Sequence, residues 1–165
     1  SHIVADLISK HTGLPFEDYV KQRLFDPLGI TRYSWERDPD GQVWGGFGLQ
    51  LTARDLAKVG QVYLDQGRWQ GSQLVPSDWV ERSSVAQIEV PTSNSGYSLQ
   101  WWISESTGTR IFFGLGFGGQ VLMVIPAKDI VIVALQEHLV SFSQSNTQWQ
   151  NFATRIFGPV FRSVD

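Results

Sequence analysis

A hydroxyl or thiol nucleophile needs an activating partner, and the sequence contains none of the common pairs. The chain has no cysteine, which excludes thiolate catalysis and disulfides. A serine can be activated by a lysine one helical turn later, in a Ser-x-x-Lys motif. None of the four lysines meets this condition, because the residues three positions before them are Leu7, Asp18, Asp55 and Ile125. None of the four tyrosines begins a Tyr-x-Asn triplet either.

The most unusual chemistry-bearing feature of the sequence is a glycine-rich run, Gly114-Leu115-Gly116-Phe117-Gly118-Gly119. Glycine has no side chain, so such a run lets a ligand or another backbone approach a strand closely. The run is also compatible with a plain bulged strand, because glycine inside a strand often marks a bulge. Both interpretations place the run in or beside a strand.

Side chains that could bind a metal are present, but their spacing is not that of ligand sets. His2 and His138 have no partner at ligand spacing. Asp38-Pro39-Asp40-Gly41 hints at calcium binding, but no glutamate follows at the required distance, so a turn is expected. His11-Thr12-Gly13 forms a His-x-Gly triplet of the kind that can serve a catalytic site, but it lies at the end of an expected helix, where glycine is the usual stop and histidine suits the helix dipole, so a helix cap is expected. We therefore predict neither a metal site nor a cofactor.

Seven tryptophans need an explanation in a chain of this length. Aromatic side chains of this size bury a large apolar area, so Trp79, Trp101 and Trp149 are expected to pack in the core and against the sheet. Trp44 is different because Gly45-Gly46 follows it and lets the backbone pass close to another group. We expect Trp44 to line a substrate cleft.

The bulk composition is that of a globular domain and limits the classes of partner. The chain has 165 residues, of which 42% are apolar and 18% charged, and its net charge is −3. It has no basic stripe that would neutralise phosphates, so nucleic acid is a poor partner. No apolar run reaches the roughly 18 residues that a membrane-spanning helix needs. The chain begins inside an expected helix, without Met or a signal peptide, which indicates that its N-terminus is a cut.

The residue patterns predict an α+β fold in which helices precede an antiparallel sheet. Apolar residues at helical spacing, with a stop at Gly13–Pro15, predict helices in residues 2–25, 53–66, 77–83 and 146–161. Apolar, β-branched and aromatic runs predict antiparallel strands near 97–104, 109–116, 119–126 and 130–136, whereas 84–96 has the pattern of a loop. We expect a mainly helical portion in 1–96, and a sheet of three to four strands with a C-terminal helix in 97–165.

Four segments, in this order, resemble the second half of the penicillin-recognising serine hydrolases. This family comprises the class C β-lactamases, the D-Ala-D-Ala carboxypeptidases and related esterases. The segments are residues 3–8 with 12–16 and 25–30, Gly45-Gly46 with 51–57 and Gly60, 97–102, and 114–120 with 124–126. The resemblance covers nearly all of residues 1–165. It implies part of a β-lactamase/transpeptidase-like domain and a periplasmic or secreted location.

The resemblance also implies acyl transfer through a serine. The family's Ser-x-x-Lys and Tyr-x-Asn motifs are expected upstream of Ser1, so this chain would be the C-terminal part of a serine acyl hydrolase that is inert alone. The third motif, Lys-Thr-Gly or His-x-Gly, aligns with Gly114-Leu115-Gly116, which we expect to contact substrate. The backbone N–H of Phe117 is expected to belong to the oxyanion hole. Without the motif's cation and hydroxyl, a β-lactam carboxylate cannot be held in the usual way, which favours an esterase, amidase or peptidase.

Two other functions stay open at this point. One is a binding module that reads carbohydrate or peptide with aromatic residues on its sheet, and the other is an inactive homologue that kept a binding role. The partners implied by the resemblance are the N-terminal half of the same protein and, in that whole protein, a small ester or amide substrate. The chain alone is expected to expose the strand ending at Gly116 as a free edge, together with apolar residues such as Ile3, Leu7 and Val62. It would then form a homodimer.

Overall fold

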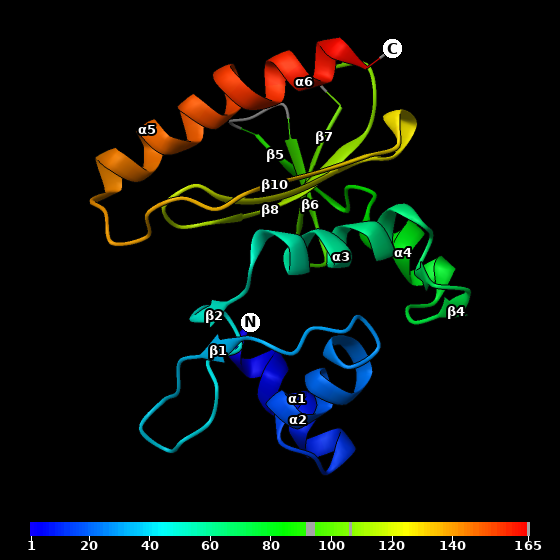
Figure 1. Cartoon of the computed structure of the whole chain (residues 1–165), viewed down its shortest axis with the longest axis vertical. Coiled ribbons are helices and arrows are strands. Elements are labelled where there is room, and N and C mark those ends of the chain that lie inside the picture. Colours follow the sequence, from blue (N-terminus) through cyan, green and yellow to red (C-terminus); the bar gives the residue numbers. More distant parts are fainter. Residues whose placement is uncertain (92–94, 106, 165) are drawn as a thin grey trace. The chain divides into compact units, whose positions relative to one another are not determined.

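The computed structural model describes residues 1–91, 95–105 and 107–164. Its contacts divide the chain into two units, Ser1–Asp55 and Leu56–Asp165, each with its own elements (Figure 1). The sequence pattern changes from helical to alternating near residue 97, so the division by contacts falls well before the change in pattern. The second unit joins helices from the predicted helical portion to the predicted sheet.

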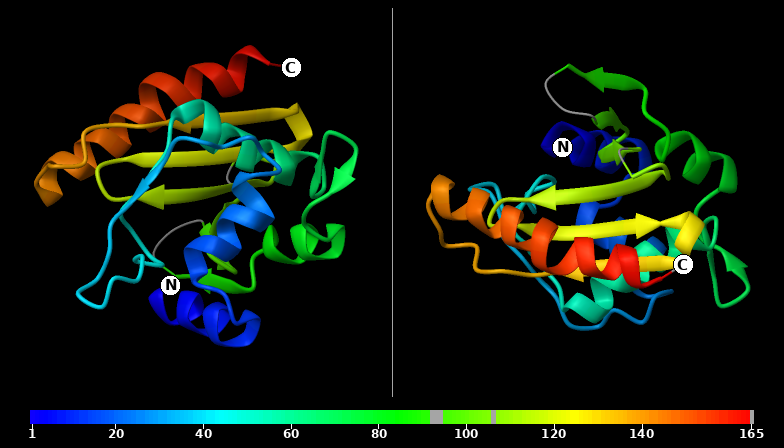
Figure 2. Two further views of the ribbon diagram at one scale, coloured as in Figure 1. Left: turned by 60° about the horizontal axis from the view of Figure 1, so that its bottom comes forward. Right: turned by 90° about the horizontal axis from the view of Figure 1, so that it is seen from above.

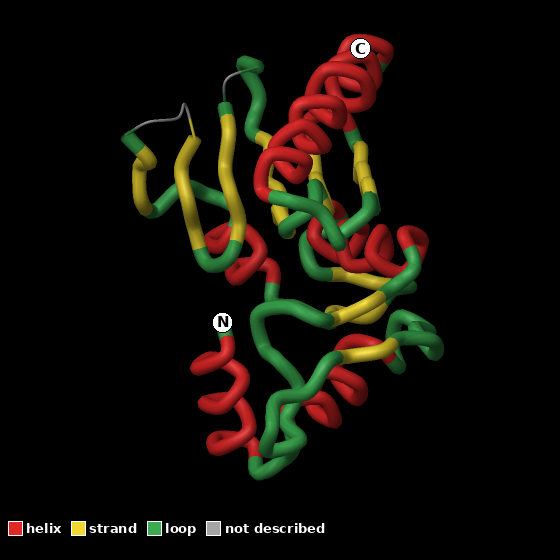
Figure 3. Tube along the Cα trace, turned by 90° about the vertical axis from the view of Figure 1, so that its left-hand side faces the viewer, coloured by secondary structure: helices red, strands yellow, loops and turns green. Residues whose placement is uncertain are grey.

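The first unit begins with two helical segments separated by a glycine stop. They are α1 (His2–Thr12) and α2 (Phe16–Val20), which continues as a π-helical turn, η1 (Lys21–Phe25) (Figure 3). Gly13 ends α1 with a left-handed φ of 72° and donates its N–H to the Ser9 carbonyl. This is the stop that the sequence predicts. A short antiparallel pair follows, β1 (Ser34–Trp35) with β2 (Leu49–Gln50), and the buried Phe25 packs against Trp35 and Tyr33.

The second unit is built on a six-stranded antiparallel sheet whose strands follow one another in chain order. The strands are β5 (Ile88–Val90), β6 (Ser95–Ser98), β7 (Trp101–Ser104), β8 (Ile111–Gly116), β9 (Gln120–Ile125) and β10 (Ile130–Ala134). A 3-10 turn, η2 (Pro126–Lys128), joins β9 to β10, and these two strands are antiparallel as predicted from the short connection.

Helices cover both faces of this sheet, as Figure 1 shows for α3 (Ala53–Leu64) and α5 (Phe142–Phe152). On one face, Leu56 and Val59 of α3 pack on a buried cluster from three strands: Trp101, Ile103, Phe112, Leu122 and Val124. The opposite cluster is Ile111, Phe113, Val121, Met123, Ile125, Ile132 and Phe152. That face is covered by α5 and its continuation through η3 (Ala153–Phe157) and α6 (Gly158–Ser163), which lie across β8 to β10 (Figure 2).

The helix α3 approaches the sheet closely at Gly60. A Cβ atom built there would lie 2.5 Å from Val131 Cγ1 and 2.9 Å from Leu122 Cδ1. Glycine inside a helix costs about 1 kcal/mol relative to alanine. Here that cost is offset by the close packing that its missing side chain permits. A helix, α4 (Ser77–Ser83), and a two-residue hairpin of β3 (Arg68–Trp69) and β4 (Ser72–Gln73) complete the unit.

The predicted sheet of three to four strands is too small. The predicted strand 97–104 is in fact a hairpin, because Leu99 and Gln100 form a turn in which Gln100 has a φ of 75°. A further strand, β5, lies inside the predicted loop 84–96, of which residues 92–94 lie outside the described residues. The last helix also begins earlier than predicted, since Ser141 caps it through a reciprocal capping box with Gln144.

Two expectations about exposed surface are also corrected. The strand ending at Gly116 is not an edge strand, because β8 lies between β7 and β9, and the sheet's edges are β5 and β10. Val62 is buried, with only 1% of its surface exposed. Ile3 and Leu7, by contrast, are 74% and 59% exposed on α1. The apolar surface that the sequence predicts is therefore present on α1 but not at Val62.

Candidate functional site

The segment Gly114–Gly116 forms the half-paired end of β8. Its three residues pair with Leu122, Val121 and Gln120 of β9, in that order. On the other side, the pairing of β8 with β7 ends at Phe113, opposite Trp102. The last three residues of β8 are therefore paired with β9 alone. Phe117 follows the last paired residue and is 55% exposed.

Open space lies over Gly114, on the face of the sheet that α3 covers. Directly paired residues share a face, and Gly114 pairs with Leu122, which packs against α3 residues. A Cβ atom built on Gly114 would meet no atom within 4 Å. Packing therefore does not require glycine at this position, which is where the family resemblance places lysine or histidine. The vacant volume is available to a ligand that lies against the strand.

The turn after β8 requires glycine twice. Gly118 and Gly119 have φ values of 77° and 72°, in the region that side chains disfavour. A Cβ atom on Gly118 would lie 2.6 Å from the Glu137 carbonyl oxygen, and one on Gly119 would lie 2.5 Å from Gln136 Nε2. The turn that follows Phe117 is thus tightly packed, at Gly118 and Gly119, against the segment after β10.

Trp44 lies in the first unit, in a loop that the indole of Trp35 closes. The Trp35 Nε1–H donates to the carbonyl oxygens of Trp44 and Phe47, at 2.8 and 3.2 Å. The rings of Trp44 and Phe47 stack, with centroids 4.9 Å apart and an interplanar angle of 21°. Phe47 is 59% exposed. The loop therefore presents a stacked aromatic pair in which Phe47 is exposed and Trp44 is half-buried, and the sequence pattern indicates Trp44 alone.

Gly45 explains why this loop can lie against the start of α1. A Cβ atom on Gly45 would lie 2.6 Å from Ala5 Cβ and 2.9 Å from the Ser1 carbonyl oxygen. The Gly45 N–H donates to His2 Nδ1 at 3.2 Å, and the His2 ring packs on Trp44 with centroids 4.8 Å apart. The glycine pair predicted to allow close approach therefore approaches α1 itself. The structure holds Trp44 with Phe47 and His2 in one unit, and Gly114–Phe117 together in the other.

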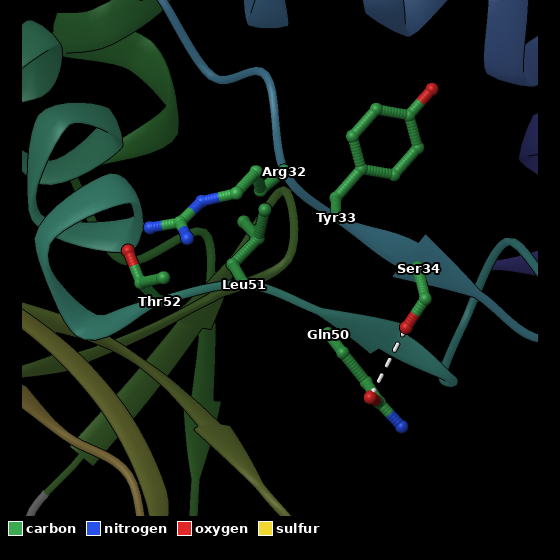
Figure 4. Close-up of a pocket in the computed structure, with 6 residues that line it drawn as sticks. All are labelled: Arg32, Tyr33, Ser34, Gln50, Leu51 and Thr52. Carbon is green, nitrogen blue, oxygen red and sulfur yellow. Dashed lines mark hydrogen bonds between the residues drawn. The ribbon is translucent and has the colours of Figure 1, made fainter.

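A separate open groove of about 340 Å³ lies in the first unit. It is lined by Arg32, Tyr33, Ser34, Gln50, Leu51 and Thr52 (Figure 4). The Ser34 hydroxyl donates to Gln50 Oε1 at 3.1 Å, and the Thr52 hydroxyl is engaged with Asp55 at the start of α3. Burial raises the pKa of the Tyr33 phenol, and the negative charge of Glu17 raises it further. The groove offers hydrogen-bond donors but none of the residues predicted for the site.

The acidic turn and the histidines do not form a metal centre in the described part of the chain. Asp38 Oδ1 accepts hydrogen bonds from the N–H groups of Asp40 and Gln42, both at 2.9 Å, which is the predicted turn. Asp38 Oδ2 lies 3.5 Å from His2 Nε2. Among the described residues, no group of three or more His, Cys, Asp or Glu side chains lies close enough together to bind one metal ion. In the same part of the chain, no helix has the length and apolarity that crossing a bilayer demands.

The chain is similar to proteins of one family over nearly its whole length. A family model described as beta-lactamase matches residues 1–151. A 6-aminohexanoate-dimer hydrolase from Paenarthrobacter ureafaciens is 28% identical over 174 aligned positions, which cover 99% of this chain and 43% of that protein.

Solved structures of two relatives share the fold. A putative 6-aminohexanoate-dimer hydrolase from Bacillus anthracis superposes with a TM-score of 0.80 at 26% identity, over 96% of this chain and 42% of that one. An octameric penicillin-binding protein homologue from Pyrococcus abyssi superposes with a TM-score of 0.70 at 20% identity, over 93% and 40%. The chain thus spans less than half the length of these relatives. Because the family model matches all but its last residues, the chain belongs to the β-lactamase family.

Proposed function

We propose that this chain is the C-terminal part of a serine acyl hydrolase that cleaves a linear amide or ester through an acyl-enzyme. The observation that carries the proposal is the half-paired end of β8, where Phe117 follows the last ladder pair beside open space. A backbone N–H that is not used by the sheet can stabilise the oxyanion of a tetrahedral intermediate. The nucleophile and its base would come from the part of the protein outside this chain.

The residue at position 114 favours a neutral substrate over a β-lactam. A β-lactam carries a carboxylate beside its reactive carbonyl, and a lysine or histidine would pair with it. Gly114 supplies no charge, while it leaves the volume over the strand empty. A linear amide or ester needs no cation there and can occupy that volume. The name of the Paenarthrobacter relative, a 6-aminohexanoate-dimer hydrolase, supports an amide of this kind.

The stacked pair of Trp44 and Phe47 would supply the apolar part of substrate binding. Their loop is held by the Trp35 indole and by the close contact of Gly45 with α1. A fixed aromatic surface loses little conformational entropy when a ligand covers it. We therefore assign Trp44, with Phe47 beside it, to an aliphatic segment of the substrate.

Burial of the sheet's aromatic residues disfavours the alternative of a sheet-based binding module. Trp101 is 8% exposed and packs in the cluster beneath α3, and Trp149 of α5 packs against the cluster on the opposite face. Trp79 of α4 is 42% exposed, so the prediction that it packs in the core is wrong, but it does not lie on the sheet. A stacking platform for sugars or peptide needs aromatic faces open to solvent. The stacked pair of the Trp44 loop, with Phe47 exposed, lies outside the sheet, where a hydrolase can use it.

The rest of the protein is the partner that we propose for the free edge of β10. Its five residues are Ile130-Val131-Ile132-Val133-Ala134, without a charge or a proline that would block pairing. Further strands of the sheet would pair there, and further helices would cover Ile3 and Leu7 of α1.

The isolated chain is expected to use the same edge to form a homodimer. An uncharged, β-branched edge favours antiparallel pairing with a second copy. Sedimentation velocity at micromolar concentration measures this, and we expect a dimer that dissociates on dilution. A monomer at every concentration, with no binding of a hydrophobic dye, would contradict the expectation.

The proposed hydrolase activity is tested on the complete protein that contains this chain. We expect hydrolysis of linear amide dimers and of p-nitrophenyl esters, and much weaker hydrolysis of nitrocefin. A fluorophosphonate should label one serine outside residues 1–165, followed three positions later by lysine, as peptide mass spectrometry would show. Absence of both hydrolysis and labelling would exclude the proposal and leave an inactive binding homologue.

A further inference from the structure

Two glutamines pair with each other at the end of the sheet that carries the turn after β8. The regular β9–β10 ladder ends with Val121 opposite Ala134. Beyond this pair, the side-chain amide of Gln120 makes the hydrogen bonds to Gln136 that a strand's main chain would otherwise make. Its Oε1 accepts the Gln136 N–H at 3.0 Å, and its Nε2 donates to the Gln136 carbonyl oxygen at 2.7 Å. One side-chain amide thus satisfies both main-chain groups of Gln136.

The Gln136 side chain in turn donates a hydrogen bond to the backbone of the turn after β8. Its Nε2 donates to the Gly119 carbonyl oxygen at 2.8 Å, and Gln120 Nε2 also reaches the Gly118 carbonyl oxygen at 3.3 Å. On the remaining side, the Gly118 N–H donates to Ser145 Oγ of α5 at 2.9 Å. Side chains from β9, from the segment after β10 and from α5 therefore hold the turn's backbone at Gly118 N–H, Gly118 C=O and Gly119 C=O.

This arrangement holds each of those backbone groups and leaves the neighbouring Phe117 N–H out of the network. Gly118 and Gly119 are buried, and both glutamines are half-buried, so their hydrogen bonds are partly shielded from water. Hydrogen bonds of this kind gain strength from a low local dielectric and from mutual polarisation. The turn therefore has little freedom to rotate the peptide group that joins Gly116 to Phe117.

From this geometry we infer that Gln120 and Gln136 are positioning residues for the oxyanion site of this hydrolase. The inference rests on the proposed function. An oxyanion donor is effective when it is oriented before charge develops, so that no reorganisation is needed during the reaction. The two glutamines meet this need by fixing the turn on the side opposite the substrate. They do not touch the substrate themselves.

Substitution in the complete protein separates positioning from folding. Gln136→Ala removes the contact to Gly119, and Gln120→Glu keeps the size of the side chain but replaces its donor with an acceptor. We expect each to lower kcat on an ester substrate about 10- to 100-fold, since a misplacement near 1 Å can cost about 10²-fold. KM should stay within about twofold. Gln150→Ala is the control, because Gln150 is an exposed glutamine of α5 and should change neither constant.

The pH dependence of the Gln120→Glu variant gives a sharper test. Below the pKa of the new carboxyl group, its proton can again be donated to the Gln136 carbonyl oxygen. The kcat of this variant relative to the unsubstituted protein should therefore rise as the pH falls through that pKa. The Gln136→Ala variant has no such group and should show a constant ratio. A constant ratio for both variants would count against positioning through this hydrogen bond.

Amide hydrogen exchange in the 165-residue chain provides a readout that needs no activity. The Gly118 N–H, which donates to Ser145 Oγ, should exchange at least about tenfold faster in Gln136→Ala than in Gln150→Ala, because the turn opens locally. Unchanged exchange, or unchanged kcat in an active protein, would overturn the inference and leave the proposed function standing. A complete protein that hydrolyses nothing would overturn both.

Discussion

The 165-residue chain alone will hydrolyse neither an amide dimer, an activated ester nor a β-lactam above the rate in buffer. None of its lysines lies one helical turn after a serine, and none of its tyrosines begins the Tyr-x-Asn triplet. The oxyanion donor that we propose, the Phe117 N–H, would therefore have no activated nucleophile within this chain. Removing the nucleophile of a serine hydrolase lowers kcat by about 10⁶-fold.

The measurement is the initial rate at equal molar concentrations of the chain and of the complete protein. Treatment with a fluorophosphonate, followed by peptide mass spectrometry, checks the same point without a substrate. Stoichiometric labelling of any serine in residues 1–165 would refute the prediction, because it would reveal an activated hydroxyl in this chain. The complete protein serves as the positive control for both measurements.

Phe152→Ala will destabilise the sheet unit more than any other single truncation that we propose. Phe152 is 1% exposed in the cluster beneath α5. Its ring stacks on Trp149 at 5.6 Å, and Trp149 stacks on Phe113 of β8 at 5.8 Å. Replacing a buried phenylalanine with alanine costs about 3–5 kcal/mol, a large part of the roughly 5–15 kcal/mol that stabilises a typical domain. We expect α5 to detach at ordinary temperature.

The matched control is Phe142→Ala, in the first turn of the same helix. Phe142 is 75% exposed, so its loss should change the free energy of unfolding by no more than about 0.5 kcal/mol. Urea unfolding followed by tryptophan fluorescence measures both variants. Equal midpoints for the two would show that the stacked aromatic residues do not hold α5 against the sheet.

The pattern of residue types was enough to predict the helices and the long strands. The stop at Gly13, the capping residues at Thr52 and the alternating runs that form β8 to β10 each carry a local signal. The turn at Leu99 and Gln100 carries none, since neither residue is a usual turn former, although Gln100 has a positive φ. The prediction therefore merged two strands into one.

The composition of the candidate site was predicted only in part, for a similar reason. The glycine-rich run and its place at a strand end follow from local sequence. The contacts of Gln136 and Ser145 with the turn do not, because 17 residues separate Gln136 from Gly119 and 27 separate Ser145 from Gly118. The partnership of Trp44 with Phe47 depends on the Trp35 indole. The position of β8 inside the sheet depends on β5 to β7, of which β5 was not predicted.

The chain order of the six strands has a consequence for how this unit assembles during synthesis. Each strand pairs with its neighbours in sequence, so each pairing closes a short loop and loses little chain entropy. A hairpin of this kind forms in about 1–10 μs, whereas translation adds about 5–20 residues per second. The sheet can thus grow by one strand at a time as the polypeptide leaves the ribosome. α5 then covers a layer that is already assembled.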